Sequence, residues 1–160
     1  MSLTTAMKIP KSIALFVCVC ALLTACSKPD YHTADGASGR FIDLRGKWLV
    51  ISYWAEWCKP CIEEMPELNQ FGAKFASTAT VFAVNYDNAQ DDKLQQQIKK
   101  LHIELPVLLQ DPAVQLGYQR PEALPTTFIF NPEGELKATL VGPQTGASLA
   151  AAMGQPVAVP

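Results

Sequence analysis

The chain has 160 residues, which fits a single domain, and its 49% hydrophobic and 18% charged residues exclude a chain that is disordered throughout. Its 13 basic and 15 acidic residues give a formal net charge of −2, and the basic residues form no cluster larger than pairs such as Lys99–Lys100. We therefore expect no nucleic-acid partner, because binding of that kind depends on neutralising phosphates.

Residues 1–25 have the pattern of a bacterial lipoprotein signal peptide. Two lysines precede an unbroken apolar run of 11 residues, Ile13 to Leu23, which is shorter than the roughly 20 residues that a membrane-spanning helix needs. The run ends in a lipobox-like tetrapeptide, Leu23-Thr24-Ala25-Cys26, in which the Cys26 thiol would be acylated. Two alternatives remain open: a signal cut beside an incidental cysteine, and an uncleaved membrane anchor.

Lipidation at Cys26 predicts an exported protein that is held by its lipid on the periplasmic face of a bacterial membrane. Ser27 follows the cysteine, and in Gram-negative bacteria a serine there usually permits sorting to the outer membrane. Residues 26–39 are polar and rich in Gly, Ser and Asp, so we expect a lipidated flexible tether. Residues 40–160 would then form the folded domain, which we expect to be a monomer.

The first half of the domain begins with a predicted short edge strand at Phe41–Leu44. Trp48 to Trp54 is a nearly continuous apolar run with β-branched and aromatic side chains, which is typical of a central strand buried on both faces. A helix is predicted to begin at the cysteine pair that follows, since apolar residues recur there at helical spacing: Ile62, Met65, Leu68 and Phe75. Pro66 is expected to kink this helix, and its solvated face is expected to carry three glutamates, Glu63, Glu64 and Glu67.

The second half alternates strands and helices and ends in a hairpin. The predicted strands are Thr80–Asn85, Pro106–Leu109, Thr126–Phe130 and Leu136–Val141, and the predicted helices are Asp91–Leu101, Pro112–Gly117 and Thr145–Met153. A turn over Asn131–Gly134 joins the last two strands. This order predicts an α/β sandwich with a mixed sheet.

The cysteines leave one pair for chemistry. Cys18 and Cys20 fall in the predicted signal and Cys26 in the lipid anchor, so Cys58 and Cys61 remain, spaced as Cys-x-x-Cys. A bridge between them closes too small a loop to staple a scaffold, which favours redox chemistry or metal binding. Partial positive charge at the helix start favours a thiolate at Cys58, and Cys61 lies one turn further on. We expect Cys58 to be the exposed nucleophile and Cys61 the buried resolver.

The charged neighbours of the pair act in opposite directions. Lys59 favours a thiolate at Cys58, whereas Glu56 and Glu63 oppose it. The net effect of these charges on the stability of the thiolate is left open.

The segment around the pair resembles the active site of the thioredoxin superfamily. Its residues are Tyr53-Trp54-Ala55-Glu56-Trp57-Cys58-Lys59-Pro60-Cys61. A second segment, Leu124-Pro125-Thr126-Thr127-Phe128, resembles the cis-proline loop of that family, and Pro66 matches its helix-kinking proline. The helix-plus-strand segment at 91–109 and Val141-Gly142-Pro143 after the hairpin resemble the exported TlpA/ResA-like disulfide reductases. The resemblance covers about residues 40–153.

The resemblance implies a thioredoxin-like sandwich in which helices flank a central mixed β-sheet, with a helix–strand insertion in the middle. It implies catalysis by Cys58 and Cys61, a substrate groove at Trp57, Leu124 and a cis Pro125 that faces Cys58, and redox tuning by Glu56, Lys59 and Pro60. The chain departs from cytoplasmic thioredoxins at Ser52, where they carry a buried Asp that accepts a proton from the resolving cysteine. A serine cannot act in this way, which leaves water or another carboxylate, with Glu56 as a candidate.

The function that the resemblance implies is a membrane-tethered thiol–disulfide oxidoreductase that reduces disulfides of exported proteins. Typical clients are cytochrome c apoproteins and copper-assembly proteins, electrons come from a membrane thiol transporter of the DsbD/CcdA type, and no cofactor or metal is expected. A dithiol oxidase would use the same residues, because a small difference in potential decides the direction. A copper-binding assembly protein is disfavoured because the loop offers Leu124 and no histidine. A peroxiredoxin-type peroxidase is disfavoured because its reactive cysteine lies in a Pro/Thr-rich loop.

Overall fold

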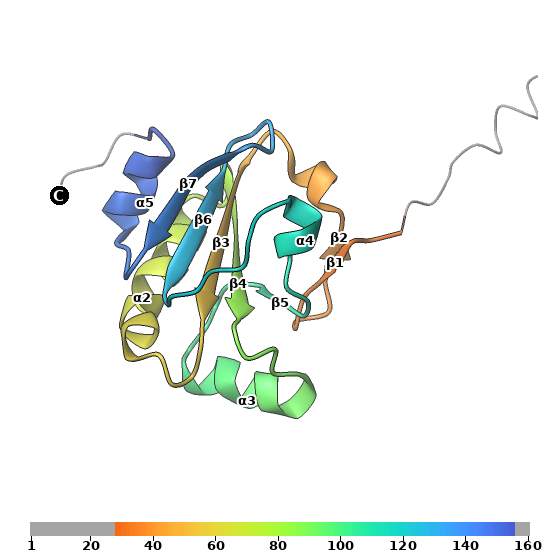
Figure 1. The fold of residues 1–160 in the computed structure, drawn as a ribbon, viewed down its shortest axis with the longest axis vertical. Helices are drawn as coiled ribbons and strands as arrows, with labels where there is room; N and C mark the ends of the chain where they lie inside the picture. Colours follow the sequence, from red (N-terminus) through yellow and green to blue (C-terminus); the bar gives the residue numbers. More distant parts are fainter. Residues whose placement is uncertain (1–27, 156–160) are drawn as a thin grey trace, which may run out of the picture.

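The computed structural model describes residues 28–155, so the predicted signal peptide and the predicted lipidation site at Cys26 lie outside the described residues. Its centre is a five-stranded mixed sheet in the order β5-β4-β3-β6-β7, and a separate two-stranded sheet joins β1 to β2 (Figure 1). The strands are β1 (Tyr31–His32), β2 (Ser38–Gly39), β3 (Trp48–Trp54), β4 (Ala79–Asn85), β5 (Val107–Leu108), β6 (Thr126–Phe130) and β7 (Leu136–Val141). The helices are η1 (Phe41–Leu44), α2 (Lys59–Lys74), α3 (Asp91–Lys100), α4 (Ala113–Leu116) and α5 (Gly146–Ala152). The predicted α/β sandwich with a mixed sheet is confirmed.

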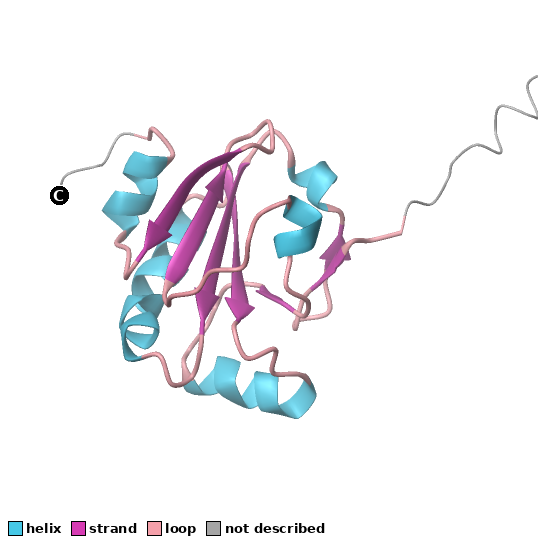
Figure 2. Ribbon diagram, viewed as in Figure 1, coloured by secondary structure: helices cyan, strands magenta, loops and turns pink. Residues whose placement is uncertain are grey.

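β3 lies at the centre of the large sheet, parallel to β4 and antiparallel to β6. Its side chains alternate between the two faces, as the pleat of a strand requires. Leu49, Ile51 and Tyr53 pack in one apolar cluster, and Val50 and Trp54 pack in the other. Both faces are covered, by α2 and α5 on one side and by η1 and α4 on the other (Figure 2), which is why the run is apolar except at Ser52.

α2 follows β3 after a short connection, and Cys58 is its N-cap. Pro60 lies in the first turn, where the missing N–H costs no helical hydrogen bond, and Pro66 lies inside the helix as predicted. The helix ends at Lys74, with Phe75 as its C-cap. No helix within residues 28–155 has the length and apolar character needed to cross a membrane.

η1 is a short 3₁₀ helix, so the prediction of an edge strand at this position is wrong. The turn buries Phe41 and leaves Ile42 exposed. The Phe41 N–H donates to Asp30 Oδ1 at 2.8 Å, and the Arg40 guanidinium donates to Asp43 Oδ2 at 2.8 Å. Side chains three residues apart meet in a helical turn and point to opposite faces of a strand, so the pairing of Arg40 with Asp43 favours the turn.

β1 and β2 form an antiparallel hairpin, so the prediction of a flexible tether over residues 26–39 is wrong where these strands lie. The Tyr31 ring packs against Phe41 and Phe82, with centroid distances of 5.0 and 5.2 Å. Thr33 is buried and forms a β-bridge to the edge strand β5. An aromatic anchor and backbone pairing therefore order a segment of polar composition, and the hairpin covers the edge of β5.

Candidate active site

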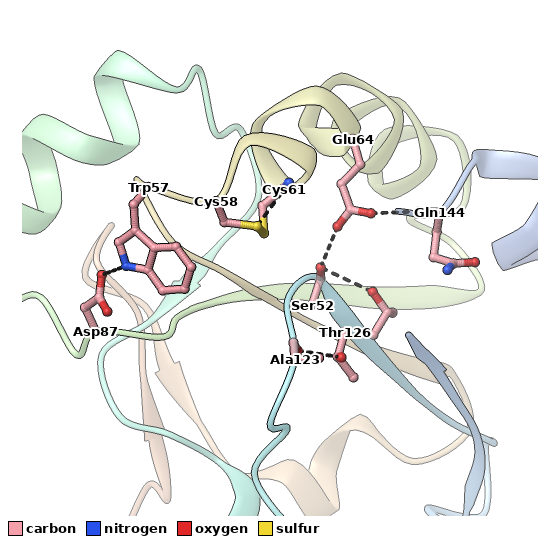
Figure 3. The surroundings of a disulfide bond; sticks show 10 residues. Ser52, Trp57, Cys58, Cys61, Glu64, Asp87, Ala123, Thr126 and Gln144 are labelled. Atoms are coloured by element: carbon pink, nitrogen blue, oxygen red, sulfur yellow. Dashed lines mark hydrogen bonds between the residues drawn. A yellow bond between two sulfur atoms is a disulfide. The ribbon is translucent and has the colours of Figure 1, made fainter. Parts of the chain in front are cut away.

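Cys58 and Cys61 are joined by a disulfide at the start of α2, with sulfurs 2.00 Å apart and Cα atoms 5.3 Å apart (Figure 3). The Cys58 sulfur accepts a hydrogen bond from the Cys61 N–H, at 3.3 Å. The N–H groups of the first helical turn thus converge near Cys58, where their partial positive charge favours a thiolate once the bond is reduced. The fold therefore brings the predicted pair together at a helix start.

Both cysteines are buried in this oxidised state. Cys58 is 4% exposed and Cys61 is 1% exposed, so the prediction of an exposed Cys58 is wrong for the disulfide form. Both belong to the apolar cluster between the sheet and α2, against which Leu124 packs. The position of Cys58 as the helix N-cap, and not its exposure, distinguishes it from Cys61.

Trp57 forms an exposed apolar surface next to Cys58 in the chain. Its side chain is 66% exposed, and Nε1 donates a hydrogen bond to Asp87 Oδ2, in the loop after β4, at 2.9 Å (Figure 3). The bond fixes the indole in place, so a large apolar side chain is held open to a partner. Trp54, by contrast, is 1% exposed and belongs to the core.

The Leu124–Pro125 peptide bond is cis, which confirms the prediction of its isomer. Thr126 Oγ1 donates to the Ala123 carbonyl at 2.8 Å (Figure 3), and the Gly142 N–H donates to the Pro125 carbonyl at 2.8 Å. Pro125 is buried, and Leu124 is half-buried against the cluster that contains both cysteines. The role of Leu124 and Pro125 in binding a substrate stays a prediction.

Glu64 is the residue of this site that the sequence analysis missed. It is 3% exposed, so the prediction of a solvated Glu64 is wrong. One carboxyl oxygen accepts a hydrogen bond from Ser52 Oγ at 3.4 Å, and the other accepts from the Gln144 N–H at 2.7 Å (Figure 3). The available signal was its spacing, because Glu64 follows Cys61 by three residues and precedes Leu68 by four, which places it on the buried stripe of α2.

The surroundings of Glu64 determine where it gains or loses its proton. Burial raises the pKa of Glu64 to about 7, against the opposing effect of the hydrogen bonds from Gln144 and Ser52. Its carboxyl group therefore changes charge near neutral pH. Glu64 lies one helical turn after Cys61, so α2 offers the carboxylate that Ser52 of β3 does not supply.

Glu56 is a poor proton acceptor because it is already paired. One of its oxygens accepts from Lys100 Nζ at 2.8 Å, and the other accepts from Gln97 Nε2 at 2.9 Å. These contacts hold the pKa of Glu56 below its usual range.

The Lys59 ammonium lies 3.7 Å from the Glu63 carboxylate. This carboxylate partly offsets the positive charge of Lys59, which we expected to favour a thiolate at Cys58. Residues 28–155 bring together no group of three or more His, Cys, Asp and Glu side chains that could hold a metal ion.

Known proteins resemble this chain in sequence and in fold. The sequence profile of the AhpC/TSA family matches residues 25–139. The chain is similar to the thioredoxin-like protein YneN of Bacillus subtilis (strain 168), at 29% identity over 123 residues that cover 73% of this chain and 71% of YneN. It is similar to the thiol-disulfide oxidoreductase ResA of Bacillus cereus, at 28% identity over 120 residues that cover 73% of this chain and 69% of ResA. The crystal structure of StoA from Bacillus subtilis matches the fold with a TM-score of 0.63 at 24% identity, over 76% of this chain and 92% of StoA.

Proposed function

Because the chain belongs to the AhpC/TSA family and is a thiol–disulfide oxidoreductase with the pair Cys58 and Cys61, we propose that it is exported, lipid-tethered and reduces disulfides in other exported proteins. The observation that carries this proposal is a disulfide at a helix start with a buried carboxyl group, that of Glu64, on the next turn. One helix then supplies a nucleophile, a resolver and a proton acceptor.

The proposed reaction consists of two thiol–disulfide exchanges. The Cys58 thiolate attacks one sulfur of a substrate disulfide, which forms a mixed disulfide and releases the other substrate sulfur as a thiolate that takes up a proton. The Cys61 thiol gives its proton to the Glu64 carboxylate and attacks the Cys58 sulfur, which releases the second substrate thiolate. The substrate gains two electrons as a dithiol, and an external dithiol donor must reduce the Cys58–Cys61 disulfide again.

The proposed substrate surface is apolar. Trp57 is exposed and held by Asp87, and Leu124 packs against the cysteine cluster, so these two side chains would contact the residues that flank a substrate cystine. Pro125 adds no backbone N–H to this surface. A partner with apolar residues beside its disulfide fits such walls best.

The proposed membrane anchor is a lipid on Cys26. The hairpin of β1 and β2 packs on the domain, so only residues 27–30 separate Cys26 from β1. The five steps from Cys26 to Tyr31 reach at most about 18 Å, so the anchored domain would lie close to the membrane surface. At the inner membrane this position would suit electron transfer from a membrane thiol transporter of the DsbD/CcdA type, and we propose cytochrome c apoproteins or copper-assembly proteins as clients. Ser27 favours the outer membrane if the source is Gram-negative.

The reduction potential of the full chain tests the proposed direction. After equilibration with glutathione buffers, we expect a low reduction potential. The Cys58–Cys61 disulfide should then persist in buffers that are reducing enough to reduce the disulfides of strong dithiol oxidants. A potential as high as that of such oxidants would mean that the protein is a dithiol oxidase and not a reductase. Each tenfold change in the equilibrium constant corresponds to about 30 mV. Tight Cu(I) binding by the reduced protein, without any exchange with glutathione, would favour a copper-binding assembly protein instead.

A further inference from the structure

A continuous chain of hydrogen bonds joins α3 to the segment that precedes Cys58. The Ala89 N–H donates to Asn85 Oδ1 at 2.9 Å, and Asn85 Nδ2 donates to Gln97 Oε1 at 3.1 Å. Gln97 Nε2 then donates to Glu56 Oε2 at 2.9 Å, and Lys100 Nζ donates to Glu56 Oε1 at 2.8 Å. Asn85 and Gln97 are each 4% exposed, so the chain runs through the interior and ends at the surface.

The direction of this chain is fixed at its inner end. A backbone N–H can only donate, so Ala89 requires the oxygen of Asn85, which leaves the Asn85 amide nitrogen to face Gln97. Gln97 must then turn its oxygen to Asn85 and its nitrogen to Glu56. Because the Lys100 ammonium also only donates, both oxygens of residue 56 must accept. An ionised carboxylate meets this requirement. The hydrogen bond from Lys100 lowers the pKa of Glu56 most, and the hydrogen bond from Gln97 lowers it further.

We propose that Gln97 and Lys100 are positioning residues that fix and neutralise the Glu56 carboxylate, so that its charge does not oppose the Cys58 thiolate in the reduced protein. Glu56 precedes Cys58 by only two residues. The inference rests on the proposed function, because it matters for catalysis only if Cys58 is the nucleophile. It gives the insertion that carries α3 a role in the redox chemistry of a cysteine on another helix.

A substitution at Lys100 leaves the other charged residues around the pair unaltered in the sequence. They are Lys59 and Glu63 on α2, which pair with each other, the buried Glu64 of the same helix, Asp87 on the Trp57 indole, and Lys93 of α3, which also acts on Glu56. A change in the thiolate after substitution of Lys100 is therefore assigned to the uncompensated Glu56 carboxylate.

The test compares Lys100→Met with Lys99→Met in the full chain. Both remove one cation from the last turn of α3, so they change the net charge and the helix end equally. The Lys99 ammonium forms no ion pair within residues 28–155. From the rate of Cys58 alkylation against pH, we expect Lys100→Met to reduce the thiolate fraction at neutral pH about threefold. The equilibrium with glutathione should also shift toward the disulfide, by less than threefold, because the thiolate form accounts for only part of the reduced protein. Lys99→Met should leave both quantities unchanged.

Two further variants separate this role from a structural one. Lys100→Arg retains a cationic donor and should restore the thiolate fraction of the unsubstituted protein. Glu56→Gln removes the carboxylate, so adding Lys100→Met to it should produce no further change in thiolate fraction. A lower free energy of unfolding without a change in alkylation would mean that Lys100 is only structural and would overturn the inference.

The outcomes distinguish the inference from the proposed function. Equal alkylation profiles for Lys100→Met and Lys99→Met would overturn the inference. If both variants still exchange with glutathione, the proposed function would stand. Absence of exchange in the unsubstituted protein would reject the proposed function, and the alkylation profiles would still decide whether Glu56 acts on the Cys58 thiolate.

Discussion

Glu64 links the protonation of one residue to the stability of the fold. Its pKa is raised to about 7 by burial, whereas an exposed glutamate has a pKa of 4.5. Between these values the folded protein retains a proton that the unfolded chain has lost. The unfolded state binds fewer protons there, so the free energy of unfolding falls as pH rises through this window.

We expect Glu64→Gln to remove most of this pH dependence. One pKa unit corresponds to about 1.4 kcal/mol, so Glu64 should lower the free energy of unfolding by about 3 kcal/mol between pH 4 and pH 8. Glutamine retains an oxygen for the Gln144 N–H and does not titrate. Denaturant unfolding of the oxidised proteins at the two pH values measures the difference.

Glu63→Gln is the matched control for this prediction. Glu63 lies beside Glu64 in the chain on the exposed face of α2, so its substitution should leave the slope with pH unchanged. An equal slope in Glu64→Gln and in the unsubstituted protein would show that folding does not raise the pKa of Glu64.

The two cysteines should differ when each is replaced alone. Cys61→Ser retains the nucleophile and lacks the resolver, so mixed disulfides with exported proteins should accumulate. Cys58→Ser should trap none, because it lacks the thiol at the N-cap of α2, where the N–H groups of the first turn favour a thiolate. Non-reducing electrophoresis after acid quenching counts the adducts, and more adducts in Cys58→Ser than in Cys61→Ser would reverse the two roles.

At the scale of elements, the hairpin of β1 and β2 belongs to the folded domain. Its polar turn resembles a linker in composition, but side-chain packing and backbone pairing attach it to the domain. Tyr31 packs on Phe41 and Phe82, and Thr33 pairs with β5. Long-range contacts of this kind determine whether a short polar segment is ordered.

Tyr31→Ala should lower the free energy of unfolding by about 2 kcal/mol, since a half-buried aromatic ring contributes less than a fully buried one. His32→Ala is the control, because His32 is the neighbouring residue of β1 and is exposed. It should change stability by less than about 0.5 kcal/mol. Equal stability of the two variants would mean that the hairpin is only loosely attached.

At the scale of the whole molecule, the first described strand and the disulfide lie on different elements. The described chain begins at β1, on the side of the sheet that η1 and α4 cover, whereas α2 covers the opposite side (Figure 1). With residues 27–30 as the only link, the domain would be held near the membrane and would turn about its β1 side. Electron donors and clients would both have to reach the start of α2.

Cys26→Ala should abolish lipidation and move the protein out of the membrane fraction or leave it with its signal attached. Mass spectrometry of the N-terminal peptide and fractionation measure both effects. Cys58→Ala is the control and should leave the protein in the membrane fraction. An unmodified Cys26 in the unsubstituted protein would reject the anchor.

The sequence by itself determined the sheet and the cysteine pair. The first and last residues predicted for β3, β6 and β7 are those of the structure. These strands could be predicted because an apolar run between turn signals depends only on local composition. The Cys-x-x-Cys spacing and the cis-proline loop identified the family for the same reason, since each is contained in a short segment.

Only the tertiary structure decided which polar groups serve the site. Glu63 and Glu64 are neighbours with the same side chain, and contact with β3 and with the loop before α5 buries one and leaves the other exposed. Gln97 and Lys100 meet Glu56 across 41 and 44 residues of chain. η1 was predicted as a strand because its local pattern fits both structures, whereas in the structure it is a turn that buries Phe41 and contacts Asp30. Burial and long-range pairing depend on how elements pack, and no local pattern of residue types specifies that packing.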